Sequence, residues 1–250
     1  MNSMNEYLPQ QIKGKKILIT GGTTGIGRAT AILLAAQGAD VLICGRHQKE
    51  LDDTIASIRG ESFSLRGVIT DLANEEGIQR LFEAVDSELG GLDIHINNAA
   101  LAFQSISDGN YSDWQYILNT NMLAYMACTN EALKRLEAKG HGHIVNIGSM
   151  SADVREKNSS VYVATKSAIQ GFSEALRKEV NERGIKVTLI EPGAVATDMQ
   201  GDDSEALKKK VDAMEMLDAR DIAACVLYTL SQPKRCDVVT VQIRPHLQEI

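Results

Sequence analysis

The sequence predicts an α/β protein: a doubly wound parallel sheet with helices on both faces, in three layers and one domain. Short, continuously apolar runs alternate with stretches of helical period almost from end to end. Such strands are typical of parallel sheets that are buried on both faces. No linker, repeat or low-complexity segment divides the 250 residues. Residues 1–250 are therefore expected to form a single domain, with residues 1–13 as an N-terminal extension.

The expected elements follow one another in strict alternation. The run Lys16–Thr20 (KILIT) has the pattern of a buried strand, and a glycine-rich turn and an Ala/Leu-rich helix to about Gln37 follow it. Further strands are expected at Val41–Cys44, Ser64–Thr70, Leu92–Ile96, His143–Ile147, Lys186–Glu191 and Val238–Ile243. Helices are expected at about Gln48–Ile58, Glu75–Leu89, Asp113–Ala138, Ser160–Arg183, Ser204–Met216 and Asp218–Leu230. Pro192 and Gly193 end the sixth strand.

Composition and charge narrow the class of protein. With 44% apolar residues and no apolar run near the roughly 18 residues that span a bilayer, the chain is expected to be soluble. Its formal net charge of −7 argues against nucleic acid or an acidic membrane as a bulk partner. The N-terminal segment lacks the apolar stretch of a signal peptide, so a cytoplasmic location is expected.

The cysteines and histidines are scattered rather than clustered. Widely spaced cysteines indicate reduced thiols in a cytosol-like compartment. His141 and His143 have no cysteine or carboxylate neighbour at ligand spacing, so no metal site is predicted. The cysteines are Cys44, Cys128, Cys225 and Cys236.

A glycine-rich turn after the first strand predicts an anion site. The turn has the spacing Gly21-x-x-x-Gly25-x-Gly27 and leads into a helix. Free N–H groups and the positive end of the helix dipole would face a phosphate there, and glycine lets the backbone approach it. A tight turn with no ligand is the alternative. The β-α-β context favours phosphate binding and thus a Rossmann-type sheet.

A second pattern suggests proton transfer. Tyr162 and Lys166 are four residues apart on an expected helix and would share one face, while Ser149 follows the fifth strand. A neighbouring cation is expected to lower the pKa of the phenol, and the serine hydroxyl could hold a carbonyl oxygen beside it. Taken alone, Tyr-x-x-x-Lys also arises by chance on surface helices.

Together these motifs carry a family resemblance. Thr20-Gly-x-x-x-Gly-x-Gly27, Asn97-Asn98-Ala99, Ser149, Tyr162-x-x-x-Lys166 and Pro192-Gly193-x-x-x-Thr197 occur in this order. Over roughly residues 14–245 the chain resembles the single-domain branch of the short-chain dehydrogenase/reductase family. One departure is Ala100, where that family usually has glycine.

The resemblance implies a role for each matching residue. Tyr162 would act as general acid or base, Ser149 would bind the carbonyl oxygen, and Lys166 would lower the tyrosine pKa and hold the nicotinamide ribose. Asn121, seven residues after Trp114, would link the lysine to solvent. The implied cofactor contacts are Gly21, Thr23, Thr24, Gly25, Ile26, Gly27, Gly45, Arg46, Asp71, Leu72, Asn98, Ala99, Tyr162, Lys166, Pro192, Gly193, Val195 and Thr197. Among these, Asp71 would bind the adenine amino group.

The end of the second strand bears on which nicotinamide cofactor is used. NAD enzymes typically carry Asp or Glu there for the ribose 2′-hydroxyl. Here Gly45 takes that position and Arg46 follows, which could form a charge-assisted fork to a 2′-phosphate. The expected cofactor is therefore NADP(H), and the expected enzyme interconverts a carbonyl and a secondary alcohol. Thr24, where many NADP-using relatives have a basic residue, keeps an NAD-linked dehydrogenase open as the alternative.

The substrate and the assembly are less closely defined. The substrate wall is expected from Leu101–Gln104, Met150–Arg155, Ala194–Ala196 and the segment around Met199–Met216. Arg155 either meets a substrate carboxylate or is a solvated loop residue. The Ile243-Arg244-Pro245 tail is similar to a subgroup of NADP-dependent alcohol dehydrogenases that includes clavulanate dehydrogenase and 3-hydroxy acid dehydrogenases.

The two long helices around residues 113–138 and 160–183 pair across a two-fold axis in many members of that family, so a homodimer or homotetramer is expected. A non-catalytic nucleotide sensor on the same fold is disfavoured, because Tyr162 and Lys166 are both present. An epimerase or dehydratase of the family's larger branch would need a further C-terminal substrate domain.

Overall fold

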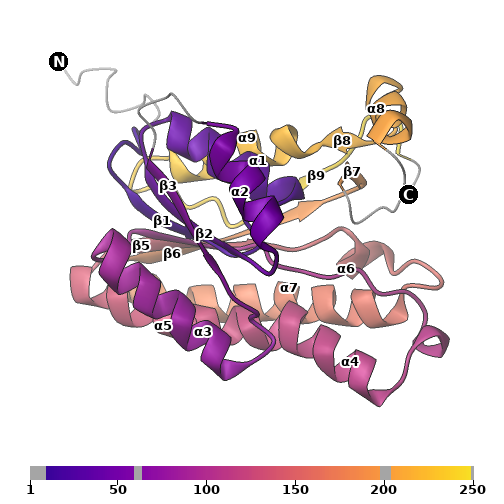
Figure 1. Cartoon of the computed structure of the whole chain (residues 1–250), viewed down its shortest axis with the longest axis horizontal. Coiled ribbons are helices and arrows are strands. Elements are labelled where there is room, and N and C mark those ends of the chain that lie inside the picture. The colour runs from indigo at the N-terminus through magenta and orange to yellow at the C-terminus, as the bar shows by residue number, and fades with distance from the viewer. Residues whose placement is uncertain (1–9, 59–63, 198–203, 249–250) are drawn as a thin grey trace.

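A seven-stranded sheet forms the centre of the part of the chain that the computed structural model describes, residues 10–58, 64–197 and 204–248. The strand order is β3-β2-β1-β4-β5-β6-β9, and every neighbouring pair is parallel (Figure 1). The strands are β1 Lys16–Ile19, β2 Asp40–Gly45, β3 Ser64–Ile69, β4 Ile94–Asn97, β5 Gly142–Ile147, β6 Ile185–Pro192 and β9 Thr240–Ile243. The predicted doubly wound parallel sheet is confirmed.

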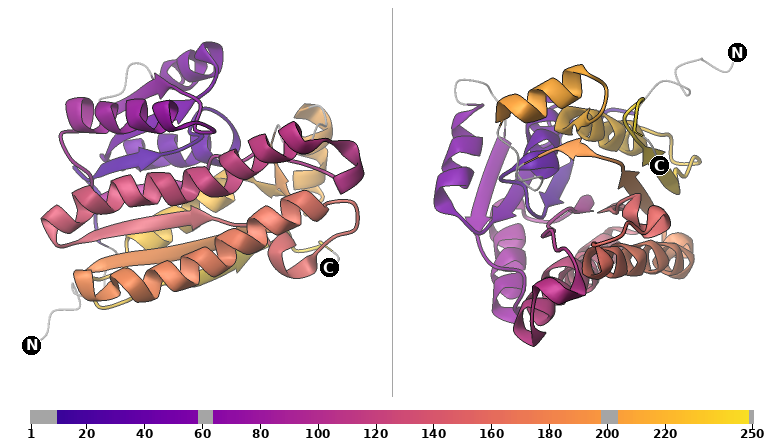
Figure 2. Two further views of the ribbon diagram at one scale, coloured as in Figure 1. Left: turned by 90° about the horizontal axis from the view of Figure 1, so that it is seen from below. Right: turned by 90° about the vertical axis from the view of Figure 1, so that its right-hand side faces the viewer.

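Helices cover both faces of the sheet, because each strand is apolar on both sides and must bury both (Figures 1 and 2). One face carries α1 Gly25–Ala36, α2 Gln48–Ala56 and α9 Ala219–Leu230. The opposite face carries α3 Glu75–Ala84, α5 Ala124–Lys139 and α7 Ser160–Val180. Leu34 and Val226 belong to the first core, and Phe82 and Leu136 to the second. Each such buried side chain stabilises the fold by about 1.5–3 kcal/mol.

The long helix expected at Asp113–Ala138 is three segments. Helix α4 spans Tyr111–Leu118, a π-helical turn spans Asn119–Leu123, and α5 continues from Ala124. Asn110 caps α4 in a reciprocal pair of hydrogen bonds with Asp113. Hydrophobic periodicity cannot reveal a single wider turn inside a continuous helix, so the sequence prediction missed it. The end of the helix expected at Glu75–Leu89 is likewise a π turn, Val85–Leu89.

Several short elements were not predicted because they are too short to have a period. Helix α6 (Ser151–Val154) begins two residues after Ser149. The strands β7 (Val195–Ala196) and β8 (Leu217–Asp218) pair with each other outside the main sheet. Helix α8, by contrast, was expected at Ser204–Met216 but spans only Ser204–Asp212, and Met214 beyond it has a positive φ of 60°.

Other predicted boundaries were wrong by a few residues, among them the end of α7 and the start of β9. Helix α7 stops at Val180, and a 3₁₀ turn, Asn181–Arg183, leads to Gly184 with φ 76°. Strand β9 begins at Thr240 rather than Val238, since the Val238 carbonyl accepts instead from the Thr188 hydroxyl at 2.7 Å. Another 3₁₀ turn, Ile106–Asp108, precedes α4.

The strand order reverses between β1 and β4. Chain connections leave these two strands toward opposite sides of the sheet, which opens a crevice at their carboxyl ends. The glycine turn follows β1 and Asn98 follows β4, so both lie at this crevice. Within the described ranges, no helix is both long and apolar enough to cross a membrane.

Candidate active site

The glycine turn between β1 and α1 has the geometry of an anion cradle. Gly21 has φ 63° and Gly25 has φ 50°, a region that side-chain-bearing residues rarely adopt. A Cβ on Gly21 would lie 2.8 Å from the Cα of Ala99. A Cβ on Gly27 would collide with the carbonyl of Gly21. The backbone of the turn therefore packs against the end of β4 and leaves the N-terminus of α1 facing the crevice.

Asn98 fastens the glycine turn to the end of β4. Its backbone N–H donates to the Thr20 hydroxyl at 3.0 Å. Its side-chain Nδ2 donates to the carbonyls of Thr20 at 3.0 Å and Gly21 at 2.9 Å. These three hydrogen bonds fix the turn in space relative to β4.

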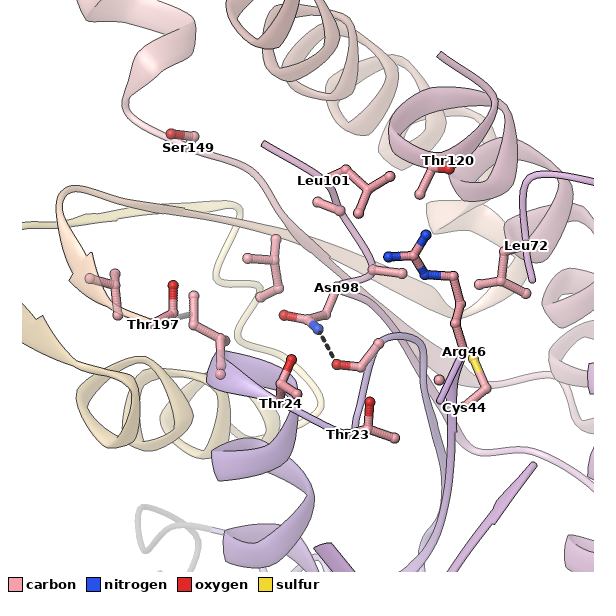
Figure 3. A pocket seen from close by; sticks show the side chains of 18 of the residues that line it. Thr23, Thr24, Cys44, Arg46, Leu72, Asn98, Leu101, Thr120, Ser149 and Thr197 are labelled. Carbon is pink, nitrogen blue, oxygen red and sulfur yellow. Dashed lines mark hydrogen bonds between the residues drawn. The ribbon is translucent and has the colours of Figure 1, made fainter. Parts of the chain in front are cut away.

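A pocket runs along the carboxyl ends of the strands, from Arg46 and Leu72 on one side to Ser149 and Thr197 on the other (Figure 3). Most of the residues expected to bind cofactor line it. They are Gly21, Thr23, Thr24, Gly25, Ile26, Gly45, Arg46, Asp71, Leu72, Asn98, Ala99, Tyr162, Lys166, Pro192, Gly193, Val195 and Thr197. Of the described residues expected to act in catalysis or to bind the cofactor, Gly27 and Asn121 do not line the pocket. Of the described residues of the expected substrate wall, only Leu101 and Val195 line it.

Lys166 lies one turn beyond Tyr162 on α7 and is almost fully buried. Its Nζ is 5.6 Å from the centre of the Tyr162 ring and donates to the Ile147 carbonyl at 3.0 Å. The Tyr125 hydroxyl donates to the same carbonyl at 3.1 Å. Burial lowers the pKa of Lys166 to about 8. The lysine is still mainly charged at neutral pH and is held in place from the sheet side.

The pKa of Tyr162 shifts in the direction opposite to the one expected from its sequence. Burial raises it, a side-chain hydrogen bond with Ser149 partly opposes that rise, and the negative charge of Glu156 adds to it. The expectation of a lowered pKa beside Lys166 was wrong for the protein without bound cofactor, because the loss of hydration around the phenol dominates. Ser149 Oγ also accepts the N–H of Ser151 at 3.1 Å, which fixes the hydroxyl beside the tyrosine.

Asn121 lies in the π turn between α4 and α5 and braces the site from behind. Its Oδ1 accepts the N–H of Leu101 at 2.8 Å, and its Nδ2 donates to the carbonyl of Leu101 at 2.8 Å. Nδ2 also lies 3.4 Å from the hydroxyl of Thr165, which donates to the Tyr162 carbonyl at 2.8 Å. Asn121 thereby joins the loop after β4 to the helix that carries the tyrosine. Turns of this type are frequent at functional sites.

Sequence reasoning missed several residues at the Arg46 side of the pocket. Arg46 Nη1 donates to the Tyr116 hydroxyl at 2.8 Å, and that hydroxyl donates to Asp71 Oδ2 at 2.9 Å. Thr120 Oγ1 and Glu50 Oε2 are buried without a hydrogen-bond partner in the described chain, and both residues line the pocket. No sequence motif could have identified them, because α2, α4 and the π turn after α4 approach the crevice only in the folded chain.

The residues present fit a nicotinamide dinucleotide. The glycine cradle and the start of α1 suit a pyrophosphate, and the unpartnered hydroxyl of Thr120 can bond to a polar ligand beside it.

Arg155, which the sequence suggested for a substrate carboxylate, is exposed, has φ 57° and donates to the Ala152 carbonyl at 3.3 Å. Residues around Met199 in the expected substrate wall lie outside the described residues. No group of three His, Cys, Asp or Glu side chains that could hold a metal occurs in the described ranges.

Comparison with known proteins agrees with this geometry. The family model for short chain dehydrogenases matches residues 15–208. The chain belongs to the short-chain dehydrogenase family. An uncharacterized oxidoreductase of Staphylococcus aureus (strain N315) is 34% identical over 232 residues, which cover 92% of this chain and 97% of that protein. This short-chain dehydrogenase is accordingly an oxidoreductase.

Solved structures place the fold in the same family. A short chain dehydrogenase from Burkholderia cenocepacia J2315 in complex with NADP has a TM-score of 0.83 and 29% identity, covering 94% of this chain and 98% of that one. L-Sorbose reductase from Gluconobacter frateurii, complexed with NADPH and L-sorbose, has a TM-score of 0.86, with 97% of this chain and all (100%) of that chain covered. At 24% identity the second likeness supports the fold alone.

Proposed function

We propose that this short-chain dehydrogenase is an NADP(H)-dependent enzyme that interconverts a carbonyl and a secondary alcohol on a small molecule. One observation carries the proposal: a single pocket joins the glycine cradle and Arg46 to Ser149, Tyr162 and Lys166. The glycine cradle and Arg46 would hold the phosphates of a dinucleotide, and Tyr162 would then lie at the nicotinamide end as a proton donor. When bound, the cofactor supplies the hydride chemistry.

The chain's own residues manage the proton and the substrate oxygen. Tyr162 donates its hydroxyl proton to the carbonyl oxygen, and Ser149 donates a hydrogen bond to the same oxygen as negative charge develops there. Lys166 holds a positive charge beside the tyrosine and can bind the nicotinamide ribose. Asn121 holds the loop at Leu101 in a fixed position relative to α7 through its hydrogen bonds to Leu101 and Thr165. Burial raises the pKa of Tyr162, so the phenol carries its proton at neutral pH and can donate it to a carbonyl oxygen.

The preference for NADP(H) rests on the end of β2. Gly45 leaves no carboxylate at the position where NAD enzymes accept the ribose 2′-hydroxyl, and Arg46 lines the pocket directly after it. The relative from Burkholderia cenocepacia, at 29% identity, is in complex with NADP. The proposal also includes the roles that the family resemblance implies for the remaining pocket residues. Asp71, for example, would bind the adenine amino group.

One observation favours an NAD-linked dehydrogenase as a second candidate. Glu50 lines the same pocket, and its Oε2 is buried with no hydrogen-bond partner in the described chain. An unpartnered carboxylate oxygen is the group that would accept a ribose 2′-hydroxyl. It would also repel a 2′-phosphate.

Initial-rate assays with NADPH and with NADH, against a panel of ketones, aldehydes and keto acids, test the proposal. We expect turnover of at least one carbonyl with a higher kcat/KM for NADPH. A higher kcat/KM for NADH would replace the first candidate by the second. Cofactor binding without turnover of any substrate would instead favour a nucleotide-sensing role.

We also propose that the chain works as a homodimer or homotetramer in a reducing, cytoplasmic setting. Helix α7 presents the small residues Ala164, Gly171 and Ala175 to solvent, and a second helix can approach such a surface closely. The thiols of Cys44 and Cys128 are free and buried. The similarity of the Ile243–Pro245 tail to the clavulanate dehydrogenase subgroup remains part of this proposal. Sedimentation velocity of wild type and Gly171→Arg tests the assembly, since the large side chain should dissociate it.

A further inference from the structure

Tyr116 of α4 lies between two charged residues, Arg46 and Asp71, at the Arg46 side of the pocket. Its hydroxyl accepts a hydrogen bond from Arg46 at 2.8 Å and donates one to Asp71 at 2.9 Å. We propose that Tyr116 is a positioning residue that selects NADP(H) over NAD(H), because it holds the Arg46 guanidinium where a 2′-phosphate binds. The proposal rests on the proposed use of NADP(H) and names a specificity residue outside the family motifs.

The direction of the two hydrogen bonds follows from their chemistry. An ionised carboxylate can only accept, so the phenol must give its one proton to Asp71. A guanidinium can only donate, so the phenol oxygen must accept from Arg46. The bridge therefore has a single arrangement. It links the residue after β2, the loop after β3 and helix α4, three segments that are far apart in the chain.

Without the phenol, the nearest charge of opposite sign for Arg46 on this bridge is Asp71. A direct ion pair would turn the guanidinium toward the carboxylate and use up the paired N–H groups that a phosphate needs. Tyr116 is a neutral spacer that keeps the two charges apart. The bond to Tyr116 is the one hydrogen bond that Arg46 makes among the described residues. Its other N–H groups are thus available for a forked contact with phosphate.

The spacer is itself well anchored. Asn119, three residues further along the chain, donates from Nδ2 to the Ala73 carbonyl at 3.1 Å, and the Ala73 N–H donates to Asp71 Oδ1 at 3.0 Å. The loop after β3 is therefore fastened to α4 through Tyr116 and to the π turn that follows it through Asn119. Figure 3 shows the Arg46 side chain extending from the end of β2 toward the wall formed by Leu72 and Thr120.

Tyr116→Phe tests the proposal because it removes only the hydroxyl of a side chain that is 37% exposed. We expect the Kd of NADPH, measured by fluorescence titration, to rise about tenfold, the loss typical of one hydrogen bond to a charged group. The Kd of NADH should change less than about twofold, since no 2′-phosphate is involved. The fragments 2′,5′-ADP and 5′-AMP, used as competitors, should show the same contrast.

A control and a double variant make the result specific. Tyr111→Phe, on the same helix and 74% exposed, should leave both dissociation constants unchanged. In an Arg46→Ala background, Tyr116→Phe should have no further effect on NADPH binding, because the residue through which it acts is gone. A further loss in that background, or an equal loss for NADH and NADPH, would overturn the inference.

The outcome also separates this inference from the proposed function. A wild type that binds NADH more tightly than NADPH contradicts the cofactor proposal itself. A wild type that prefers NADPH, together with a Tyr116→Phe variant of unchanged preference, leaves the proposed function intact and refutes the role of Tyr116.

Discussion

Asn121 and the backbone of Leu101 form a closed ring of two hydrogen bonds, each 2.8 Å long. The ring joins a π turn to a loop twenty residues earlier in the chain, and it satisfies both polar groups of the Leu101 backbone at once. Leu101 lines the pocket. A buried side-chain amide thus shapes the pocket although it does not face it.

Asn121→Leu should therefore harm stability and activity together. The variant leaves the N–H and carbonyl of Leu101 unpaired, which costs about 1–3 kcal/mol for each buried group that finds no water. Urea unfolding should show a lower midpoint, and kcat should fall as the loop shifts. Asn130→Ala, at an exposed position of α5, is the control. A midpoint equal to that of wild type would contradict the bracing role.

Tyr162→Phe should remove turnover and spare binding. Loss of the general acid costs about 10²–10⁴-fold in kcat, whereas the phenyl ring still fills its place on α7. The Kd of NADPH should stay within about threefold, because the hydroxyl contributes at most one hydrogen bond to the cofactor. Tyr228→Phe, 57% exposed on α9, should behave as wild type. Turnover comparable to wild type would exclude Tyr162 as the proton donor.

Lys166→Met should stabilise the cofactor-free protein while it inactivates the enzyme. Burial lowers the pKa of Lys166 from 10.5 to about 8. Between these values the unfolded chain binds more protons than the native one, so the stability of wild type rises with pH in that window. The variant lacks this dependence. It also leaves the Ile147 carbonyl paired with the Tyr125 hydroxyl.

The measurement is the difference in the free energy of unfolding between wild type and Lys166→Met. At pH 7 the variant should be more stable by about 1 kcal/mol or more, as expected when a buried charge is replaced by an apolar side chain of similar length. The gap should narrow from pH 8 to 10.5 in urea unfolding followed by circular dichroism. A gap that stays constant over this range would show that Lys166 titrates normally.

Gly21→Ala and Gly14→Ala form a matched pair for the glycine cradle. Both glycines have positive φ, 63° and 73°, so each substitution costs about 1 kcal/mol of backbone strain. At Gly14 the new methyl group meets nothing within 4 Å, while at Gly21 it lies 2.8 Å from the Ala99 Cα. NADPH binding should be lost in Gly21→Ala alone. Equal binding by both variants would rule out the cradle as the pyrophosphate site.

The sequence predicted those parts of the molecule that have a local signature. The strands are continuous apolar runs, and the glycine turn and the Tyr162–Lys166 spacing are set by neighbours in the chain, so their places in the fold could be anticipated. The bridge through Tyr116 joins three distant segments and has no local pattern. The pKa of Tyr162 could not be predicted for a similar reason, since it depends on how deeply the folded chain buries the phenol.

The position of β1 between β2 and β4 has a consequence for the protein's synthesis. Ile17 pairs with Val41 on one side and with Ile94 on the other. A ribosome that adds about 5–20 residues per second needs roughly 3–11 s to travel from the first partner, Val41, to the second, Ile94. During that interval one edge of an apolar strand has no partner. The nascent chain is then open to misassociation, and a chaperone that shields this edge should raise the yield of folded enzyme.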